Sequence, residues 1–159
     1  MPGDRKSKPV DEWRGLTPRE RRLFATWEAF AAACETVVER LEQALSRECD
    51  LPLAWYDVLF QLNRAPRQRL FMHQLAAAVL VSKSGLTRRI DQMESAGLVR
   101  REAVDRRSTH IVLTEAGKAT LKRAVPVAQR AIRRHFADCV TDEEIEPLDA
   151  VVRRIAECG

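Results

Sequence analysis

The sequence predicts a mainly α-helical fold that includes one small β-hairpin. Apolar residues recur at intervals of three and four over most of the 159 residues, which is the spacing of amphipathic helices. Thr17 and Thr141 are each followed by a glutamate three residues later, and this capping-box pattern marks the start of a helix. Between residues 98 and 113, two short strand-like runs flank a charged loop, as in a hairpin.

The first predicted helix opens at Thr17, with Pro18 in its first turn, and continues for about eight turns. Residues 1–16 precede it as a loosely docked lead-in. The helix is longer than a small domain needs for its own core. We therefore expect it to reach a partner chain.

Three shorter helices are expected next, over about residues 53–64, 72–79 and 82–96. A loop at 65–68 separates the first two. Ser82 can cap the third, and Gly97 supplies the left-handed residue that ends it.

The hairpin follows, with strands at about 98–102 and 109–113 and a tight charged loop between them. Thr114 then caps a fifth helix, which we expect to be kinked or interrupted at Pro126 and to end near Asp138. The last helix begins after the second capping box at Thr141.

Composition and charge narrow the class of protein. Hydrophobic residues make up 45% and charged residues 31%, which is typical of a globular chain. Residues 64–113 hold ten basic and four acidic side chains, so this segment has a net charge of +6. Because the whole chain has a net charge of +4, the remaining residues sum to −2. Positive charge concentrated in one segment favours a nucleic-acid partner. No apolar run approaches the roughly 20 residues that span a bilayer, so we expect no membrane association and a cytoplasmic location.

The predicted helix at 82–96 has two unlike faces. Leu86, Ile90 and Met93 share the face that would anchor it to the domain. The other face is short, polar and basic near the N-terminal end, and such a face can read base edges in a DNA major groove. The residues that we expect to contact DNA from this segment are Lys83, Ser84, Gly85, Thr87, Arg88 and Arg89.

The hairpin loop strengthens this interpretation, because it can place an arginine in the adjacent minor groove. Asp105, Arg106 and Arg107 stand at its tip, and Asp105 is spaced to orient Arg107 through a bidentate pair. We expect all three residues to belong to the DNA-binding surface.

Residues 82–99 and the loop pattern Asp-x-Arg-x5-Leu-Thr, which ends at Leu113 and Thr114, resemble the MarR family of bacterial transcriptional regulators. The resemblance implies a winged helix-turn-helix domain over residues 51–114 and a helical dimerisation region built from 17–50 and 115–159. It also implies a homodimer that binds a pseudo-palindromic operator in double-stranded DNA, represses a nearby gene, and is released by a small molecule or an oxidant. On this resemblance Arg107 takes the minor-groove role, Asp105 orients it, and Ser84, Thr87 and Arg88 read the major groove.

A homodimer is also expected from apolar surface. The first helix, the last helix and the second half of the fifth, with Val127, Ala131, Ile132 and Phe136, hold more apolar side chains than one small domain can cover. A second copy would bury them and would set two recognition helices about 34 Å apart.

The resemblance places an effector pocket where the dimerisation helices meet the DNA-binding domain, and a planar aromatic anion would suit it. The side chains that we expect to line this pocket are Trp27, Phe30, Trp55, Tyr56, Phe60 and His73. Ordinary core packing of the same aromatic residues remains an alternative.

Two other modes of action stay open as alternatives, a thiol- or metal-responsive regulator and a winged-helix module that binds proteins. Cys34 and Cys139 are expected to be small buried residues, and the three histidines and four cysteines lack the spacing of a metal site, so no metal or other cofactor is expected. No hydrolase, metalloprotease or phosphate-loop motif occurs, and we expect no enzymatic activity.

Overall fold

A computed structural model describes residues 14–80, 84–104 and 108–158. The chain divides into two compact units, Met1–Thr36 and Val37–Gly159, and the boundary falls inside the first helix. Within the described residues, no helix combines the length and the apolar composition that crossing a bilayer requires.

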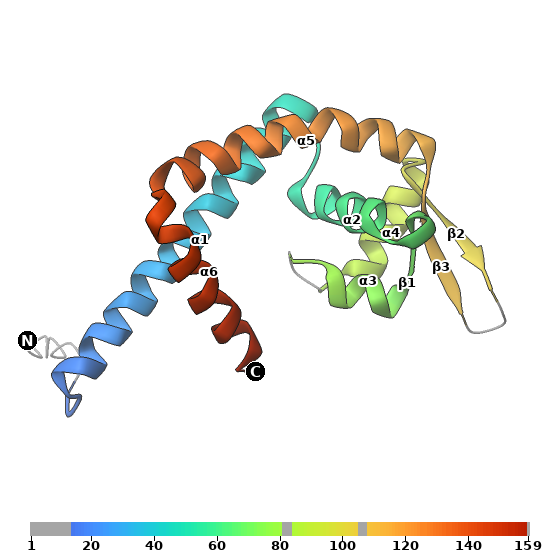
Figure 1. Ribbon diagram of the computed structural model, residues 1–159. Helices are drawn as coiled ribbons and strands as arrows, with labels where there is room; N and C mark the ends of the chain where they lie inside the picture. Colours follow the sequence, from blue (N-terminus) through green and yellow to red (C-terminus); the bar gives the residue numbers. More distant parts are fainter. Residues whose placement is uncertain (1–13, 81–83, 105–107, 159) are drawn as a thin grey trace, which may run out of the picture. The chain divides into compact units, whose positions relative to one another are not determined.

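The described residues form six α-helices, two short 3-10 turns and three strands (Figure 1). The α-helices are α1 (Pro18–Cys49), α2 (Leu53–Arg64), α3 (Met72–Ala78), α4 (Leu86–Ser95), α5 (Glu115–His135) and α6 (Asp142–Glu157). The 3-10 turns are η1 (Pro66–Gln68) and η2 (Ala137–Cys139), and the strands are β1 (Arg69–Phe71), β2 (Val99–Ala103) and β3 (Thr109–Leu113). The predicted order of six helices with a hairpin between the fourth and the fifth is confirmed.

Both predicted capping boxes are present. The backbone N–H of Thr17 donates to Glu20 Oε2 at 2.7 Å, and the N–H of Glu20 donates to Thr17 Oγ1 at 3.2 Å. At the start of α6, the N–H of Thr141 donates to Glu144 Oε2 at 3.0 Å. These bonds satisfy N–H groups that a helix start leaves without an intrahelical partner.

Helix α5 runs through Pro126 without interruption, so of the two expected outcomes, a kink or an interruption, the interruption is wrong. Proline fits helical φ, but it removes the hydrogen bond to the carbonyl four residues earlier, and its ring crowds that carbonyl. Pro126 is exposed, so that carbonyl lies on the side of the helix where water can solvate it. The helix also ends earlier than expected, because Phe136 leaves the helical region with φ −135° and η2 follows.

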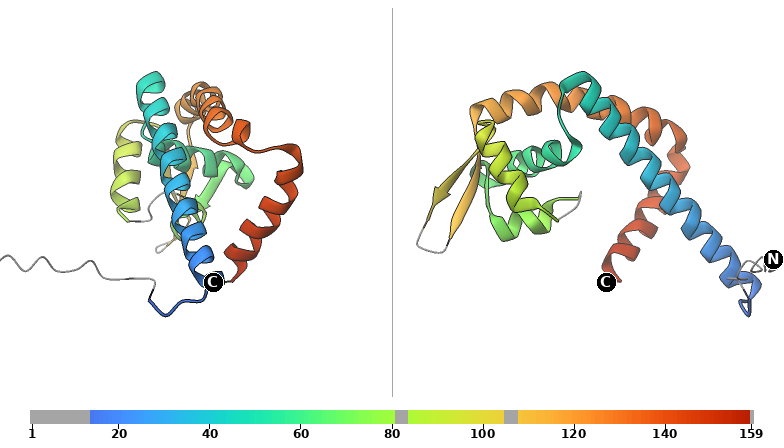
Figure 2. Two further views of the ribbon diagram at one scale, coloured as in Figure 1. Left: turned by 90° about the vertical axis from the view of Figure 1, so that its left-hand side faces the viewer. Right: turned by 180° about the vertical axis from the view of Figure 1, so that it is seen from behind.

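The hairpin is part of a three-stranded antiparallel sheet with the order β1-β3-β2, so the expectation of two strands was incomplete. Ile111 of β3 pairs with Leu70 of β1 on one side and with Arg101 of β2 on the other. Strand β1 has only three residues, too few to show an alternating pattern in the sequence. In the right-hand view of Figure 2, from behind, β2 and β3 extend together beyond the short helices.

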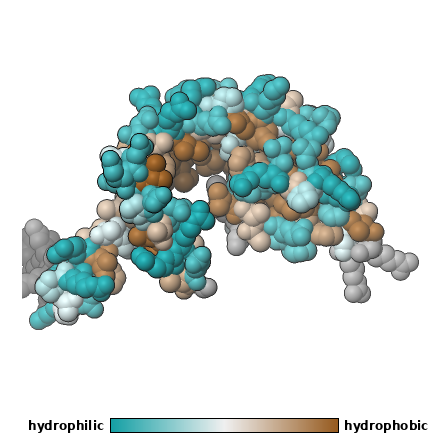
Figure 3. Space-filling view, in the orientation of Figure 1, coloured by the Kyte–Doolittle hydropathy of each residue, from teal (hydrophilic) through white to brown (hydrophobic). Residues whose placement is uncertain are grey.

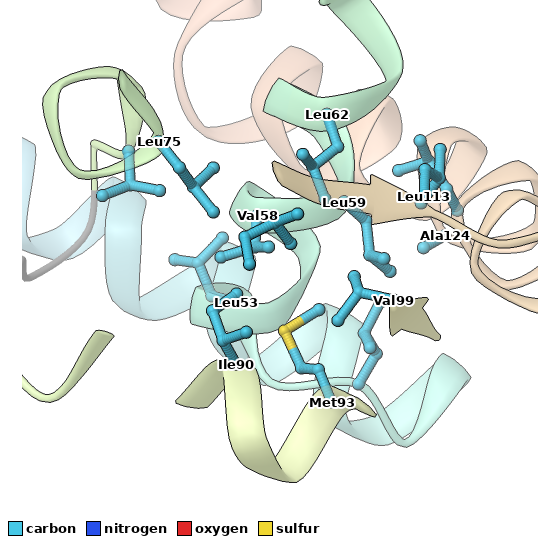
Figure 4. Packing of buried hydrophobic residues seen from close by; sticks show 14 of the residues in the cluster. Leu53, Val58, Leu59, Leu62, Leu75, Ile90, Met93, Val99, Leu113 and Ala124 are labelled. Carbon is cyan, nitrogen blue, oxygen red and sulfur yellow. The ribbon is translucent and has the colours of Figure 1, made fainter. Parts of the chain in front are cut away.

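One hydrophobic core joins α2, α3, α4 and the sheet, and we call residues 51–114 the central lobe. Leu59, Leu75 and Ile90 are fully buried in this core, and each such side chain contributes about 1.5–3 kcal/mol by leaving water. Figure 4 shows side chains from α2, α3 and α4 converging with Val99 of β2 and Ala124 of α5. The core therefore fixes α4 and the strands in one body.

Helix α6 contrasts with this core, because none of its described residues is buried. Val127 and Ala131 of α5 are buried within the chain, at 7% and 8% exposure, so the expectation that they add to an open apolar stripe is wrong. They lie on the face of α5 that includes Ala124 and Ala128 and packs inward. Ile132 and Phe136 are exposed as expected, and brown apolar patches reach the surface in Figure 3.

The cysteines are all free, and Cys34 and Cys139 are exposed. The expectation that these two are buried is therefore wrong. The segments that hold them, α1 before residue 37 and η2, contain no buried residue. Cys49 is half-buried, with its thiol 3.9 Å from the carbonyl oxygen of Arg123.

Candidate nucleic-acid interface

Helix α4 begins at Leu86, several residues later than expected. Gly85 has φ +71°, in the left-handed region that an L side chain adopts only with strain, and this conformation cannot continue a helix. Ser84 and Gly85 therefore lie in an exposed turn that leads into the helix. A Cβ at Gly85 would meet no atom within 4 Å, so glycine is required here for its backbone conformation.

The two faces of α4 are as predicted. Leu86, Ile90 and Met93 are at most 5% exposed and anchor the helix in the core. Thr87 and Arg88 are exposed beside Ser84 and Gly85, and Arg89 is half-buried at the flank. The first turn of α4 thus presents short polar and basic side chains to the outside.

A buried carboxylate on α2 holds the end of α3. Asp57 is only 5% exposed, and its Oδ2 accepts the backbone N–H of Leu80 at 2.7 Å. Its Oδ1 accepts from Gln61 Nε2 at 3.1 Å. Because a buried carboxylate needs such donors, this contact fixes where the chain leaves α3 toward α4. This role of Asp57 was not predicted from the sequence, although an acid on the apolar stripe of a helix is a usable signal.

Arg101 of β2 joins the far half of α4 to the sheet. Its guanidinium donates to Asp91 Oδ1 at 2.7 Å and also to a carboxylate oxygen of Glu94. The backbone N–H of Arg101 donates to the other oxygen of Glu94 at 2.7 Å. Burial alone would lower the pKa of Arg101, but the bonds to Asp91 and Glu94 outweigh this effect and raise it. Helix α4 and the sheet are therefore held in one orientation.

The C-terminal end of α4 is closed by Gly97, as predicted. Gly97 has φ +72°, its N–H donates to the carbonyl of Glu94 at 2.9 Å, and the N–H of Leu98 donates to Met93 at 2.9 Å. These two bonds are the pair found where a left-handed residue ends a helix. The chain then turns directly into β2.

The base of the hairpin is tied to the start of α5. The single hydroxyl proton of Thr114 is shared between the carbonyls of Gly97 and Leu98, whose oxygens lie 2.7 and 2.9 Å from Oγ1, and Oγ1 accepts from the N–H of Gly117 at 3.0 Å. A Cβ at Gly117 would stand 2.2 Å from the carbonyl oxygen of Leu98. The Leu-Thr pair that ends the hairpin therefore has a structural role, and Gly117 permits the close approach.

At the tip of the hairpin, the N–H of Val104 donates to the carbonyl of Ser108 at 2.9 Å and closes the loop. Asp105, Arg106 and Arg107, like Lys83 before α4, lie outside the described residues. The roles predicted for these four residues remain predictions.

The candidate effector residues fall into separate groups. Tyr56 and Phe60 stack at 5.8 Å between ring centroids, with the Arg64 guanidinium 5.5 Å from the Phe60 ring. Burial, and then the charge of Asp57, raise the pKa of Tyr56. Trp55 is half-buried against the core.

The other three candidates lie elsewhere in the sequence and make other contacts. Trp27 and Phe30 are exposed in the N-terminal unit, with their rings 6.4 Å apart. His73 stacks on Phe71 and lines a hollow of about 520 Å³. The remaining residues that line this hollow are Phe71, Met72, Thr87, Arg101, Ser108 and Thr109, and none of them is a predicted effector aromatic. Over the described part of the chain, no group of three or more His, Cys, Asp or Glu side chains is arranged to hold a metal ion.

Comparison with known proteins agrees with this arrangement. A sequence model of the MarR family matches residues 50–108. An uncharacterised HTH-type transcriptional regulator of Bacillus cereus is 35% identical over 105 residues, which cover 66% of this chain and 69% of the relative.

Two solved structures from Streptomyces coelicolor match most of the chain. The MarR-family regulator AbsC is 35% identical, with a TM-score of 0.79 over 91% of this chain and 96% of its own. Sco3205, a MarR-family regulator solved in complex with DNA, is 30% identical, with a TM-score of 0.79 over 89% and 92%. With this identity over nearly the full length of both chains, the protein belongs to the MarR family of transcriptional regulators.

Proposed function

We propose that this DNA-binding transcriptional regulator acts as a homodimer on a pseudo-palindromic operator, represses a neighbouring gene, and is released by a small-molecule effector. The observation that carries the proposal is the exposed, polar and basic first turn of α4 on a helix that the core and Arg101 hold rigidly. A DNA reader needs this combination, because base contacts require a fixed register in the groove.

Base reading is assigned to the start of α4. Arg88 can donate two hydrogen bonds to guanine, and Thr87 can contact base edges or a thymine methyl. Ser84 and Gly85 bring the backbone of the preceding turn close to the groove. Lys83 and Arg89 are assigned to the flanking phosphates.

The hairpin tip is assigned to the adjacent minor groove. Arg107 enters the groove, where the negative potential favours a guanidinium, and Asp105 orients it. Arg106 is assigned to the neighbouring phosphate backbone. These assignments rest on the closed loop at Val104 and Ser108 and on the family pattern.

The homodimer is supported by exposed apolar side chains in both units. The exposed large apolar residues of α1 are Leu23, Phe24, Trp27, Phe30 and Val38, and those of α5 and α6 are Ile132, Phe136, Ile145, Val151, Val152 and Ile155. Exposed stripes of this length mark an interaction surface. A second copy would bury these side chains, and the central lobe of that copy would contact the second half of the operator.

For the effector we propose a planar aromatic anion that contacts Tyr56 and Phe60, with Trp55 beside them; roles for Trp27, Phe30 and His73 stay predictions. The half-buried Tyr56–Phe60 stack, with Arg64 beside it, supplies ring faces and a cation. As a repressor of bacterial genes, the dimer would act in the cytoplasm, where the chromosome lies.

The test starts with selection of bound sites from a random duplex library by the full-length protein. Arg88→Ala should relax the selected consensus more than it lowers affinity for unrelated DNA, because a base contact is lost. Arg107→Ala should weaken binding and reduce the salt slope by about one. Arg133→Ala, an exposed arginine near the end of α5, is the matched control and should leave the consensus unchanged.

An unaltered consensus with Arg88→Ala would remove Arg88 from base reading. Failure of the wild-type protein to enrich any sequence would contradict sequence-specific binding. Absence of retention on random duplex DNA even at low salt would point to a protein-binding module, since a DNA binder is held through phosphates and is released as salt rises.

A further inference from the structure

A hollow of about 370 Å³ lies between the C-terminal part of α1 and the C-terminal half of α5, within the unit Val37–Gly159. The residues that line it come from these two helices only. They are Arg40, Gln43, Ala44, Arg47, Glu48, Val127, Arg130, Ala131, Arg134 and His135. None of them belongs to the DNA-binding surface or to the effector set assigned above.

The lining holds four arginines and a single carboxylate. That carboxylate, Glu48, is engaged by Arg130 at 2.6 Å and by Arg47 at 3.5 Å. Arg40 reaches only the amide oxygen of Gln43, at 3.4 Å. In the described residues no carboxylate pairs with Arg40 or Arg134. The hollow therefore has a clear excess of positive charge.

Stabilisation of helix ends does not account for this excess. Cations favour the last turn of a helix, and Arg134 and His135 stand in the last turn of α5. Arg40 is nine residues before the end of α1, where the helix dipole has little effect. The two helices nevertheless bring these side chains to one hollow.

The floor of the hollow is apolar. Val127 and Ala131 are buried, and Ala44 is half-buried against the core. Guanidinium groups pair with carboxylate and phosphate oxygens in bidentate geometry and are weakly hydrated. Arginines above an apolar floor thus suit an anion that has an apolar body as well as charged groups.

We propose that this α1–α5 hollow binds a compact multianionic ligand, which carries two or more carboxylate or phosphate groups and rests a small apolar body on Val127 and Ala131. Arg40 and Arg134 make the main charge contacts. Arg47 and Arg130 exchange part of their contact with Glu48 for the ligand.

The test is calorimetric titration of the full-length protein, without DNA, with benzene-1,2,4-tricarboxylate and with inorganic pyrophosphate. The tricarboxylate has both the charges and an apolar body, and pyrophosphate has the charges only. Binding of either probe at about millimolar affinity or tighter is expected. Tighter binding of the tricarboxylate would locate its ring on the apolar floor, and tighter binding of pyrophosphate would contradict the part of the proposal that places an apolar body there.

Arg134→Gln should weaken binding about tenfold, because a charge-assisted contact is lost. Arg133→Gln removes the same charge from the neighbouring exposed residue, which does not line the hollow, and should retain the wild-type affinity. Glu48→Gln should strengthen binding, since it frees Arg47 and Arg130 from a competing carboxylate. Equal melting temperatures of the free variants would exclude a folding defect.

Absence of heat with both probes at low ionic strength would overturn the proposal, as would equal weakening by Arg134→Gln and Arg133→Gln. The latter result would indicate general charge attraction. Because no DNA is present, failure of this test leaves the assignment of operator binding unaffected.

Discussion

Helices α4 and α6 have the same kind of sequence and opposite surroundings. Each places apolar residues at intervals of three and four along one face. In α4 the three apolar residues Leu86, Ile90 and Met93 are at most 5% exposed, whereas in α6 Ile145 is 54% and Ile155 is 59% exposed. The same apolar pattern is thus buried inside the central lobe and exposed to solvent on α6.

The difference teaches what an apolar stripe can and cannot specify. At about 25 cal/mol per Å² of apolar surface, a stripe indicates that a face is to be removed from water. It does not indicate which surface covers it. For α4 the cover is the core of the same chain, and for α6 we propose a second copy.

The largest expected effect comes from charging the open stripe of α6. The double change Val152→Asp with Ile155→Asp should raise the dissociation constant of the proposed dimer by at least about 100-fold, because two buried apolar contacts become buried charges. Sedimentation of the full-length protein over a range of concentrations would measure this constant. Affinity for operator-length DNA should fall with it.

Ala150→Asp is the control for this change, since Ala150 is exposed on the polar side of the same helix and should leave the dimer intact. If the double variant sediments like the wild type, α6 is not part of the dimer interface. A second copy would then not explain why the apolar residues of α6 are exposed while those of α4 are buried.

The second effect concerns the contact that joins the lobe to α5. Gly117→Ala should lower the free energy of unfolding by about 2–3 kcal/mol, since its Cβ would stand 2.2 Å from a backbone oxygen that cannot swing away. Urea unfolding at a protein concentration that keeps the oligomeric state constant would measure the loss.

Gly97→Ala provides the contrast. A Cβ at Gly97 would meet no atom within 4 Å, so the positive φ is the only source of strain for alanine at this position. Gly97→Ala should therefore lower the free energy of unfolding by about 1 kcal/mol. Equal losses for the two variants would mean that the close approach at Gly117 adds nothing beyond an ordinary glycine substitution.

A smaller effect is expected from the link between α4 and β2. Arg101→Gln removes the guanidinium bonds to Asp91 and Glu94 and should cost about 1 kcal/mol, a value reduced because the side chain is 31% exposed. Operator affinity should fall by more than this loss of stability predicts, since α4 would lose its fixed orientation. Gel-shift titration and urea unfolding of the same variant would separate the two quantities.

Arg100→Gln is the matched control on the same strand. Arg100 pairs only loosely with Glu102, at 3.7 Å, and its side chain is 55% exposed, so the cost should stay below about 0.5 kcal/mol. An operator affinity that falls equally in both variants would indicate general charge attraction to DNA rather than a positioning role for Arg101.

Local signals predicted most of the fold. The capping boxes at Thr17 and Thr141, the left-handed Gly97 and the Thr114 cap each act within a few residues, and all four are present. The features that sequence reasoning missed depend on distant neighbours. Strand β1 forms because β3 accepts it as a partner, and Asp57 is buried because Leu80, 23 residues later, donates to it.

In the candidate site, too, the features that depend on local sequence were predicted and those that depend on distant partners were missed. The spacing of apolar residues in α4 predicts which face is buried in the core. The same helical spacing places Thr87 and Arg88 on the opposite, exposed face. The start of the helix was misplaced because a glycine inside a polar run does not reveal whether its φ is positive. Arg101 was missed because its partners Asp91 and Glu94 come together with it only when β2 folds back along α4.

The smallest expected effect concerns strain that the packed lobe tolerates. The described non-glycine residues with positive φ are Asp50, Arg67 and Gln68, all at the edge of or within the central lobe and none in α6. The N–H of Gln68 donates to the carbonyl of Ala65 at 2.9 Å, so Pro66 and Arg67 are the central residues of a turn whose second position favours glycine.

Arg67→Gly should therefore raise the free energy of unfolding by about 0.5–1 kcal/mol, because glycine adopts φ 55° without the clash that a Cβ causes. Arg67→Ala separates this effect from the loss of the charge, since alanine keeps the Cβ and should give no gain. Urea unfolding of both variants measures the difference. A gain with glycine only would show that the core of the lobe holds an unfavourable turn in place, and equal stability of all three proteins would mean that the turn carries no strain. If the glycine variant is more stable but binds the selected operator less tightly than the alanine variant, the rigidity of the turn itself contributes to DNA binding.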